Sequence, residues 1–301
     1  MSRFLPALLC ASLLAGCASA PALQPAAPAT LPAPAPAPAA ALISTPPNDN
    51  LDAVAWTQTA IEHDLIYLQT YRDAQSRLLA ALHDPRWDAL PTDDRIAPPK
   101  GLKPAVILDI DETALDNSPY QARLVKHGGE YNEASWAAWC KEERARALPG
   151  AVAFTRFAAK HGIAVIFISN RDKSLDSVTV ANLRKVGFPV QGPDAFLGLG
   201  TFVPGCEQVG TQKSCRRQLI SRKYRVLMQF GDQLGDFVTV TANNDAGRAE
   251  AVAPYMKWIG RRWFVLPNPT YGDWQPALFG NNWSAPIQER RRDMINALRK
   301  E

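Results

Sequence analysis

The chain has 301 residues and a formal net charge of +4, with 47% hydrophobic and 21% charged residues. This composition is typical of a globular protein and excludes a disordered chain. There is no basic run with interleaved aromatic residues, which argues against nucleic-acid binding. The four histidines are widely separated, which argues against a zinc cluster. The sequence also contains no Walker loop and no G-x-S-x-G motif.

The first 17 residues have the pattern of a secretion signal. Arg3 precedes an apolar run that is too short to cross a bilayer comfortably as a mature helix. The run ends in Leu-Ala-Gly-Cys, which resembles a bacterial lipobox, so we expect lipidation of Cys17. An ordinary signal peptide is the alternative. Because Ala18 follows the cysteine, the expected location is the bacterial cell envelope, at the outer membrane.

Residues 18–50 are almost entirely alanine and proline. Proline removes backbone donors and keeps the chain extended, so this segment is predicted to be a tether without a core. A folded domain is predicted for residues 51–301. Apolar residues recur at helical spacing through residues 51–83, and Pro85 ends that pattern.

Residues 105–120 organise the rest of the chain. An apolar run suited to a strand buried on both faces ends in Asp109-Ile110-Asp111. Side chains alternate along a strand, so Asp109 and Asp111 project to the same side. Two adjacent carboxylates repel each other unless a divalent cation such as Mg²⁺ lies between them. The alternative is a turn or helix cap assisted by Thr113.

Three further polar segments follow in chain order. Strands are predicted at residues 163–168, 224–230 and 263–266, and a helix opens near residue 213. The polar residues at these points are Ser169, Asn170, Arg171, Lys213, Asp232 and Asp236. A hydroxyl and backbone N–H groups at a strand end can bind phosphate, and a lysine can neutralise a phosphoryl group. Taken singly, each segment could equally be a helix cap or a turn.

Together these segments resemble the four motifs of the haloacid dehalogenase (HAD) superfamily, which begin with D-x-D-x-T at Asp109. The longer strings D-I-D-E-T-A-L-D-N-S-P-Y and P-N-P-T-Y-G-D-W resemble the bacterial class C acid phosphatases. Ala114 stands where that family usually has a larger apolar residue. Strands that alternate with helices predict an α/β fold with a doubly wound parallel sheet. The resemblance adds a small helical cap, built from residues 51–84 and 121–148.

The resemblance implies Mg²⁺-dependent hydrolysis of phosphate monoesters outside the cytoplasm. Asp109 would be the nucleophile, and Asp111 would give and take the proton. The implied catalytic residues are Asp109, Asp111, Thr113, Ser169 and Lys213, and Asn170 and Arg171 would contact substrate. The implied metal ligands are Asp109, the Asp111 backbone carbonyl, Asp232 and Asp236. Asp236 has two candidate roles, a ligand through water or a group that orients Lys213. Coordination is expected to keep the pKa of Asp109 low.

Trp136 and Tyr271 are candidates for stacking on a nucleobase, which would make the enzyme a 5′-nucleotidase. For Trp136, packing within the cap is the alternative. Two other functions stay open: phosphate transfer to other alcohols, and a non-catalytic surface binding protein on the same fold. The expected partners are a small phosphomonoester and, through the lipid anchor, a membrane. A homodimer is compatible with the sequence.

Cys206 and Cys215 enclose a short loop beside Lys213. An exported protein can form disulfides, so we expect these two residues to be bridged. Two free thiols are the alternative. Arg216 and Arg217 are expected to be solvated or structural.

Overall fold

The computed structural model describes residues 47–299, which belong to one compact unit, Thr45–Glu301. Cys17, the signal segment and all but the end of the expected tether lie outside the described residues. Between residues 47 and 299, no helix is both long enough and apolar enough to cross a bilayer.

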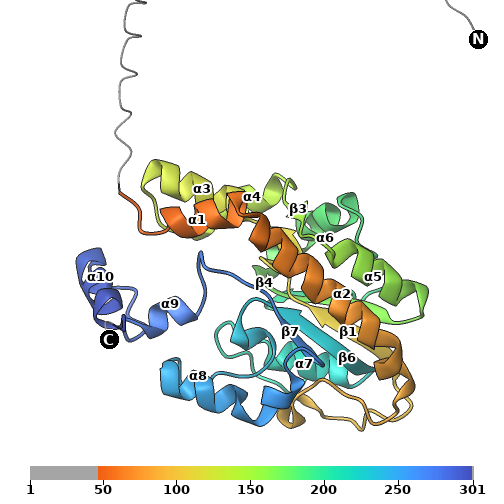
Figure 1. Ribbon diagram of the computed structural model, residues 1–301. Helices are drawn as coiled ribbons and strands as arrows, with labels where there is room; N and C mark the ends of the chain where they lie inside the picture. Colours follow the sequence, from red (N-terminus) through yellow and green to blue (C-terminus); the bar gives the residue numbers. More distant parts are fainter. Residues whose placement is uncertain (1–46, 300–301) are drawn as a thin grey trace, which may run out of the picture. The chain divides into compact units, whose positions relative to one another are not determined.

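A five-stranded sheet lies at the centre of this unit (Figure 1). The strands are β5 (Phe196–Leu199), β4 (Ala164–Asp172), β1 (Lys103–Leu108), β6 (Tyr224–Gly231) and β7 (Trp263–Val265), in that spatial order. All neighbours pair in parallel, so the predicted parallel sheet is confirmed. The edge strand β5 was not predicted, because its four residues are too few to show a pattern.

Alternate residues of β1 face two separate hydrophobic layers. Val106 and Leu108 belong to the cluster that includes α2 and α5, whereas Ala105 and Ile107 belong to the cluster that includes α7. This burial on both faces explains the uninterrupted apolar run, and it places β1 in the middle of the sheet. The residues that follow β1 therefore emerge at the centre of the sheet's carboxyl edge.

Helices cover both faces of the sheet (Figure 1). The helices of the described residues, which include others away from the sheet, are α1 (Leu51–Thr59), α2 (Ile61–His83), α3 (Ser118–His127), α4 (Glu133–Lys141), α5 (Ala151–Lys160), α6 (Asp176–Lys185), α7 (Ser214–Ser221), α8 (Asp245–Val252), α9 (Trp274–Ala277) and α10 (Ile287–Asn296). Short 3₁₀ helices form η1 (Thr92–Asp94), η2 (Lys173–Leu175), η3 (Leu234–Asp236) and η4 (Ala253–Trp258). A two-stranded antiparallel ribbon joins β2 (Leu115–Asp116) to β3 (Arg146–Ala147).

The helix predicted over residues 51–83 is broken at Ala60, whose backbone is extended with φ −79° and ψ 120°. Neither proline nor glycine marks this break, so propensity alone could not reveal it. The two halves have different partners: α1 bonds to α3 through Gln58 and Ser118 at 3.2 Å, and α2 packs on α5. In Figure 1, α1, α3 and α4 lie together, where the resemblance implied a helical cap.

Helix α2 fixes the loop that follows β1. The Tyr67 hydroxyl donates to the backbone oxygen of Glu112, and the Tyr71 hydroxyl donates to that of Thr113 at 2.8 Å. Both tyrosines are almost completely buried. The buried face of a long helix thus holds the loop that carries Asp109 and Asp111.

Candidate active site

The loop after β1 is tightly constrained. The backbone N–H of Asp109 donates to the Phe230 oxygen at 2.9 Å, which continues the pairing of β1 with β6. Glu112 has φ +53°, a left-handed conformation that residues other than glycine seldom adopt. This sharp turn reverses the chain immediately after Asp111, so both aspartates stay at the sheet's carboxyl edge.

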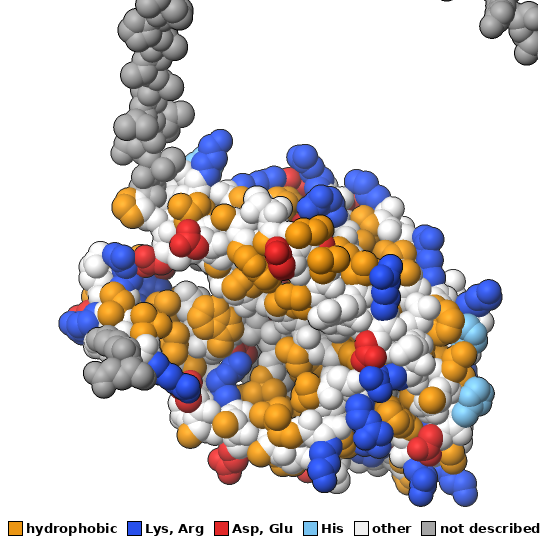
Figure 2. Space-filling model, in the orientation of Figure 1, with side chains coloured by type: hydrophobic (Ala, Val, Ile, Leu, Met, Phe, Trp, Pro, Cys, Tyr) orange, Lys and Arg blue, Asp and Glu red, His pale blue; other side chains and the backbone are white. Residues whose placement is uncertain are grey.

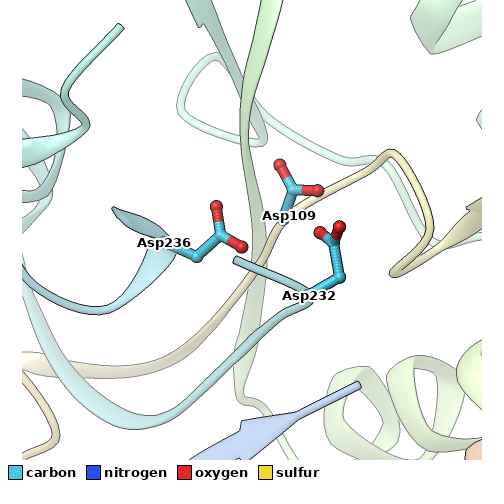
Figure 3. Close-up of side chains that lie close together, drawn as sticks. All are labelled: Asp109, Asp232 and Asp236. Carbon is cyan, nitrogen blue, oxygen red and sulfur yellow. The ribbon is translucent and has the colours of Figure 1, made fainter. Parts of the chain in front are cut away.

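Three carboxylates converge at this edge. Asp109, Asp232 after β6, and Asp236 at the end of η3 point toward a common space (Figure 3), and one carboxylate oxygen of each lies within 4.8 Å of the others. Burial raises the pKa of Asp109 well above its ordinary value, and the neighbouring carboxylates raise it further, against the effect of Lys213. Burial also raises the pKa of Asp232 to about 7. In the protein alone Asp109 therefore lacks the low pKa expected for a metal-bound carboxylate.

Lys213 is the positive centre of this cluster. It precedes α7 and is almost completely buried. Its Nζ contacts Asp109 and lies 2.7 Å from Oδ1 of Asp236. The other oxygen of Asp236 accepts the backbone N–H of Gln233 at 2.9 Å. Because both oxygens are engaged within the chain, the geometry favours the role in which Asp236 orients Lys213.

The remaining oxygens suit a hard divalent cation. Oδ2 of Asp232 accepts N–H groups from Gln233 at 2.6 Å and Asn268 at 2.8 Å. Its Oδ1 has, among the described residues, only a 3.5 Å contact with Thr113. A buried, negatively charged set of oxygen donors is the environment that Mg²⁺ prefers. A cation there would also supply the charge that Asp109 and Asp232 need to ionise together.

Asp111 has a different partner from Asp109. Its Oδ1 accepts two N–H groups of Arg171, at 2.9 and 2.8 Å, and the Asn117 amide at 2.8 Å. Its Oδ2 accepts no hydrogen bond from residues 47–299. Arg171 is fully buried and lies over the ring of Trp136, 5.3 Å from its centroid. Arg171 thus anchors Asp111, and it also lines the cavity, so its expected contact with substrate stays a prediction.

The residues after β4 lie at different depths. Ser169 is completely buried, and its Oγ accepts the backbone N–H of Arg171 at 3.0 Å. Asn170 reaches the cavity, and its Oδ1 accepts an N–H of Arg216 at 2.7 Å. The Asn170 amide group is then left as a donor toward the cavity. Thr113 is completely buried.

A cavity of about 1470 Å³ opens over these groups, which exceeds the roughly 300–1,000 Å³ of common small-molecule sites. The candidate residues that line it are Asp109, Asp111, Trp136, Asn170, Arg171, Lys213, Asp232, Asp236 and Tyr271. Phe279 and Trp283, between α9 and α10, and Arg290, within α10, also line the cavity. In Figure 2, hydrophobic side chains gather in the region where Figure 1 places α1, α9 and α10.

Both predicted aromatic residues line this cavity. Trp136 packs edge-to-face on Tyr120 with ring centroids 5.1 Å apart, and only 9% of its surface is exposed. The Tyr271 hydroxyl contacts the carboxylate of Glu112, which connects this ring to the loop after β1. Tyr131 also lines the cavity and is exposed, although nothing in its sequence context marked it.

Comparison with known proteins identifies the family. A family model described as HAD superfamily, subfamily IIIB (acid phosphatase) matches residues 49–274. The chain belongs to this family. It is also similar to the class C acid phosphatase from Bacillus anthracis solved with tungstate bound, with 32% identity and a TM-score of 0.72. That match covers 84% of this chain and 97% of the other.

Curated plant proteins are more distant relatives of this HAD chain. Vegetative storage protein 1 of Arabidopsis thaliana is 31% identical over 169 residues, which is 55% of this chain and 54% of that protein. Acid phosphatase 1 of Solanum lycopersicum is 27% identical over 173 residues, or 55% and 57% of the two chains. The chain thus spans little more than half the length of these relatives.

The sequence analysis did not single out Asn117 as a site residue, although it did predict the disulfide beside Lys213. Asn117 binds Asp111, and its Oδ1 accepts the indole N–H of Trp139 at 2.8 Å. Its position within the longer D-I-D-E-T-A-L-D-N-S-P-Y string was visible, but its role depends on side chains far along the chain. Cys206 and Cys215 are joined by a disulfide in the structure, with Cα atoms 5.6 Å apart. The bridge ties the preceding loop to the first turn of α7.

Proposed function

We propose that this chain is a Mg²⁺-dependent acid phosphatase that hydrolyses phosphate monoesters through an aspartyl-phosphate on Asp109. The observation that supports it best is the buried contact of Asp109 with Lys213, beside Asp232, at the mouth of a large cavity. A nucleophilic carboxylate and a fixed positive charge at one point are what phosphoryl transfer needs.

In the first step, an Asp109 oxygen forms a bond to phosphorus and the bond from phosphorus to the ester oxygen breaks. The proton on Oδ2 of Asp111 passes to the leaving oxygen, so an alcohol departs. Arg171 and Asn117 hold the other oxygen of Asp111 and thereby aim Oδ2. Such positioned proton transfer contributes about 10²–10⁴-fold to rate.

In the second step, a water oxygen bonds to phosphorus and the bond to the Asp109 oxygen breaks. Asp111, now ionised, takes a proton from that water and returns to its starting form. Lys213 and the free amide of Asn170 would contact the phosphoryl oxygens in both steps. The cation, when bound, would offset negative charge on those oxygens. The related B. anthracis enzyme binds tungstate, a tetrahedral oxyanion.

The leaving-group side supports nucleoside 5′-monophosphates as the preferred substrates. Trp136 and Tyr271 present aromatic surface to the cavity, and the cavity is large enough for a nucleoside. The test is a substrate panel with and without Mg²⁺, using the wild type, Asp109→Asn, and the surface variant Asp194→Asn. We expect turnover of nucleotides by the wild type and Asp194→Asn, and none by Asp109→Asn. Appreciable activity of Asp109→Asn would refute the proposal.

A second function draws on the similarity to a vegetative storage protein. In that case the fold would bind a ligand without turnover, and the panel would detect no phosphate release by the wild type. A third possibility is transfer of the phosphoryl group from Asp109 to an added alcohol. Product analysis with glycerol present distinguishes it from hydrolysis.

The location is proposed from the sequence alone. We propose that an acyl group on Cys17 anchors the protein in the outer membrane and that residues 18–50 act as a tether. Cys17→Ser should release the protein from membranes or block its processing. If mass spectrometry finds no acyl group on the wild-type protein, the anchor is excluded.

A further inference from the structure

The first turn of α7 connects several parts of the active site. Lys213 contacts Asp109 and Asp236, and the next two basic residues, Arg216 and Arg217, are also fully buried. Of the two expected roles, solvated or structural, both arginines have the structural one. A buried guanidinium is stable only with several acceptors around it.

Arg216 fixes the loops on one side of Lys213. Its Nη1 donates to the backbone oxygen of Ser169 at 2.5 Å, and its Nη2 donates to Oδ1 of Asn170 at 2.7 Å. The same nitrogen donates to the backbone oxygens of Thr211 and Gln212 at 3.3 and 3.2 Å. Arg216 thus joins the loop after β4 to the segment that leads into Lys213.

Arg217 fixes the loop on the other side. Its Nη1 donates to the backbone oxygens of Gly235 and Asp236, both at 3.0 Å. Its Nε donates to Oδ2 of Asp94 at 2.6 Å. Among the described residues, Asp94 is the only carboxylate within salt-bridge distance of Arg217. Asp94 itself is only 3% exposed, so the pair is shielded from water.

Asp94 lies in η1, 123 positions before Arg217 and outside every motif of the family. We infer that Asp94 is a positioning residue for the phosphatase site. It fixes the guanidinium of Arg217, and Arg217 in turn fixes the backbone of Gly235 and Asp236. The carboxylate of Asp236 lies near those of Asp109 and Asp232 (Figure 3) and holds Lys213 against Asp109, so this contact depends on that backbone.

Replacing Asp94 should disturb η3 in particular, because it removes the carboxylate partner of Arg217. In Asp94→Asn, the buried guanidinium of Arg217 loses its only carboxylate partner among the described residues and must find other acceptors. The acceptors already in contact are the oxygens of Gly235 and Asp236, so the rearrangement would fall on η3 and on the geometry of Asp232 and Asp236.

The same segment provides a matched control. Asp88 accepts two N–H groups of Arg95 at 2.8 and 2.6 Å. Arg95 also donates to the backbone oxygens of Ser221 and Tyr224, both at 2.9 Å. This second ion pair therefore holds η1 against the opposite end of α7, away from Lys213. Loss of Asp88 should weaken the packing of η1 without moving η3.

The inference rests on the proposed function, and its test compares Asp94→Asn with Asp88→Asn. Calorimetric titration with MgCl₂ alone measures cation affinity, and steady-state kinetics with para-nitrophenyl phosphate measure kcat and KM. We expect Asp94→Asn to weaken Mg²⁺ binding about 10- to 100-fold, the range seen when residues that support metal ligands are changed. We also expect the fall in kcat to be larger than any change in KM. Asp88→Asn should keep both values within about twofold.

Equal effects of the two variants, or none for a folded Asp94→Asn, would overturn the inference. If Asp94→Asn does not fold, Asp94→Glu and Asp88→Glu are compared in the same way, and only the first should alter Mg²⁺ affinity and kcat. If the wild type hydrolyses the ester but binds no Mg²⁺, the proposed cation is wrong. The inference is then decided by kcat alone, because the contact of Asp236 with Lys213 needs no cation.

Discussion

The cavity has a reaction side, around Lys213 and Arg171, and a side proposed to receive the leaving group, which includes Trp136, Tyr271 and the wall along α10. Different interactions hold these two sides. Around Lys213 the charged groups are almost fully buried, and the buried Arg171 holds Asp111, whose side chain is only 17% exposed. Along α10, Arg291 pairs with Asp49 although their side chains are 43% and 53% exposed. Breaking a buried pair is strongly destabilising, whereas an exposed pair contributes about 0–1 kcal/mol. The groups around Lys213 are therefore held by buried ion pairs, whereas the wall along α10 includes an exposed pair that is more easily altered.

The largest effect should come from the reaction side. Asp111→Asn removes the proton donor but leaves Asp109 and Lys213 in contact. With an alkyl phosphate, whose leaving group needs a proton, kcat should fall about 10²–10⁴-fold. With para-nitrophenyl phosphate, whose leaving group needs none, the first step should be nearly unaffected. Measuring product release in the first turnover on both esters checks this.

Equal losses on the two esters would show that Asp111 does not act as the acid. A variant that keeps the acid but disturbs its anchor provides the control: Asn117→Ala leaves Oδ2 in place and removes one bond to Oδ1. Its effect should be smaller than that of Asp111→Asn on the alkyl ester.

The next effect concerns the aromatic residues of the leaving-group side. Stacking on a base contributes about 1–3 kcal/mol, or about 5- to 150-fold in affinity. Changing Trp136 and Tyr271 to Ala together should raise KM for a nucleoside 5′-monophosphate by a factor in that range. KM for a small aliphatic phosphate should hardly change. A comparable rise for both substrates would assign these rings to packing alone.

The acidic cluster should make stability depend on pH and Mg²⁺. Burial raises the pKa of Asp232 to about 7, so its neutral form is favoured in the folded protein. The stability that this provides is present below the ordinary pKa of about 4 and is lost as pH rises through about 7. Mg²⁺ binds the ionised form, so its stabilising effect should increase over the same range.

Thermal unfolding at pH 5 and pH 8, with and without MgCl₂, measures this linkage. We expect a larger Mg²⁺-induced rise of Tm at pH 8, by about 2–4 °C for each kcal/mol. In Asp232→Asn the Mg²⁺-induced rise of Tm should be small at both pH 5 and pH 8. A rise in the wild type that is the same at pH 5 and pH 8 would contradict a cation site built on Asp232.

The smallest effect should come from the ion pairs of α10. Arg291→Ala removes an exposed pair with Asp49 and should lower the free energy of unfolding by about 1 kcal/mol or less. Its kcat for para-nitrophenyl phosphate should equal that of the wild type. A large loss of activity would show that α10 takes part in the chemistry, and the contrast between the two sides would fail.

The contrast also explains what the sequence could predict. Asp109, Asp111 and Asp232 follow buried strands, and strand patterns with local spacing are readable from a single chain. The sheet and the convergence of these groups at its edge were therefore predictable. The break at Ala60 and the pair of Asp94 with Arg217 were not, because they depend on contacts between segments far apart in the chain.

The most direct test of the account is to identify the residue that carries the phosphoryl group. Asp111→Asn lacks the base for the second step, so the intermediate from para-nitrophenyl phosphate should accumulate. Rapid acid quenching and peptide mass spectrometry should then find one phosphoryl group, located on Asp109. A phosphoryl group on any other residue would contradict the account. So would equal release of phosphate and para-nitrophenol from the first turnover with no phosphorylated peptide.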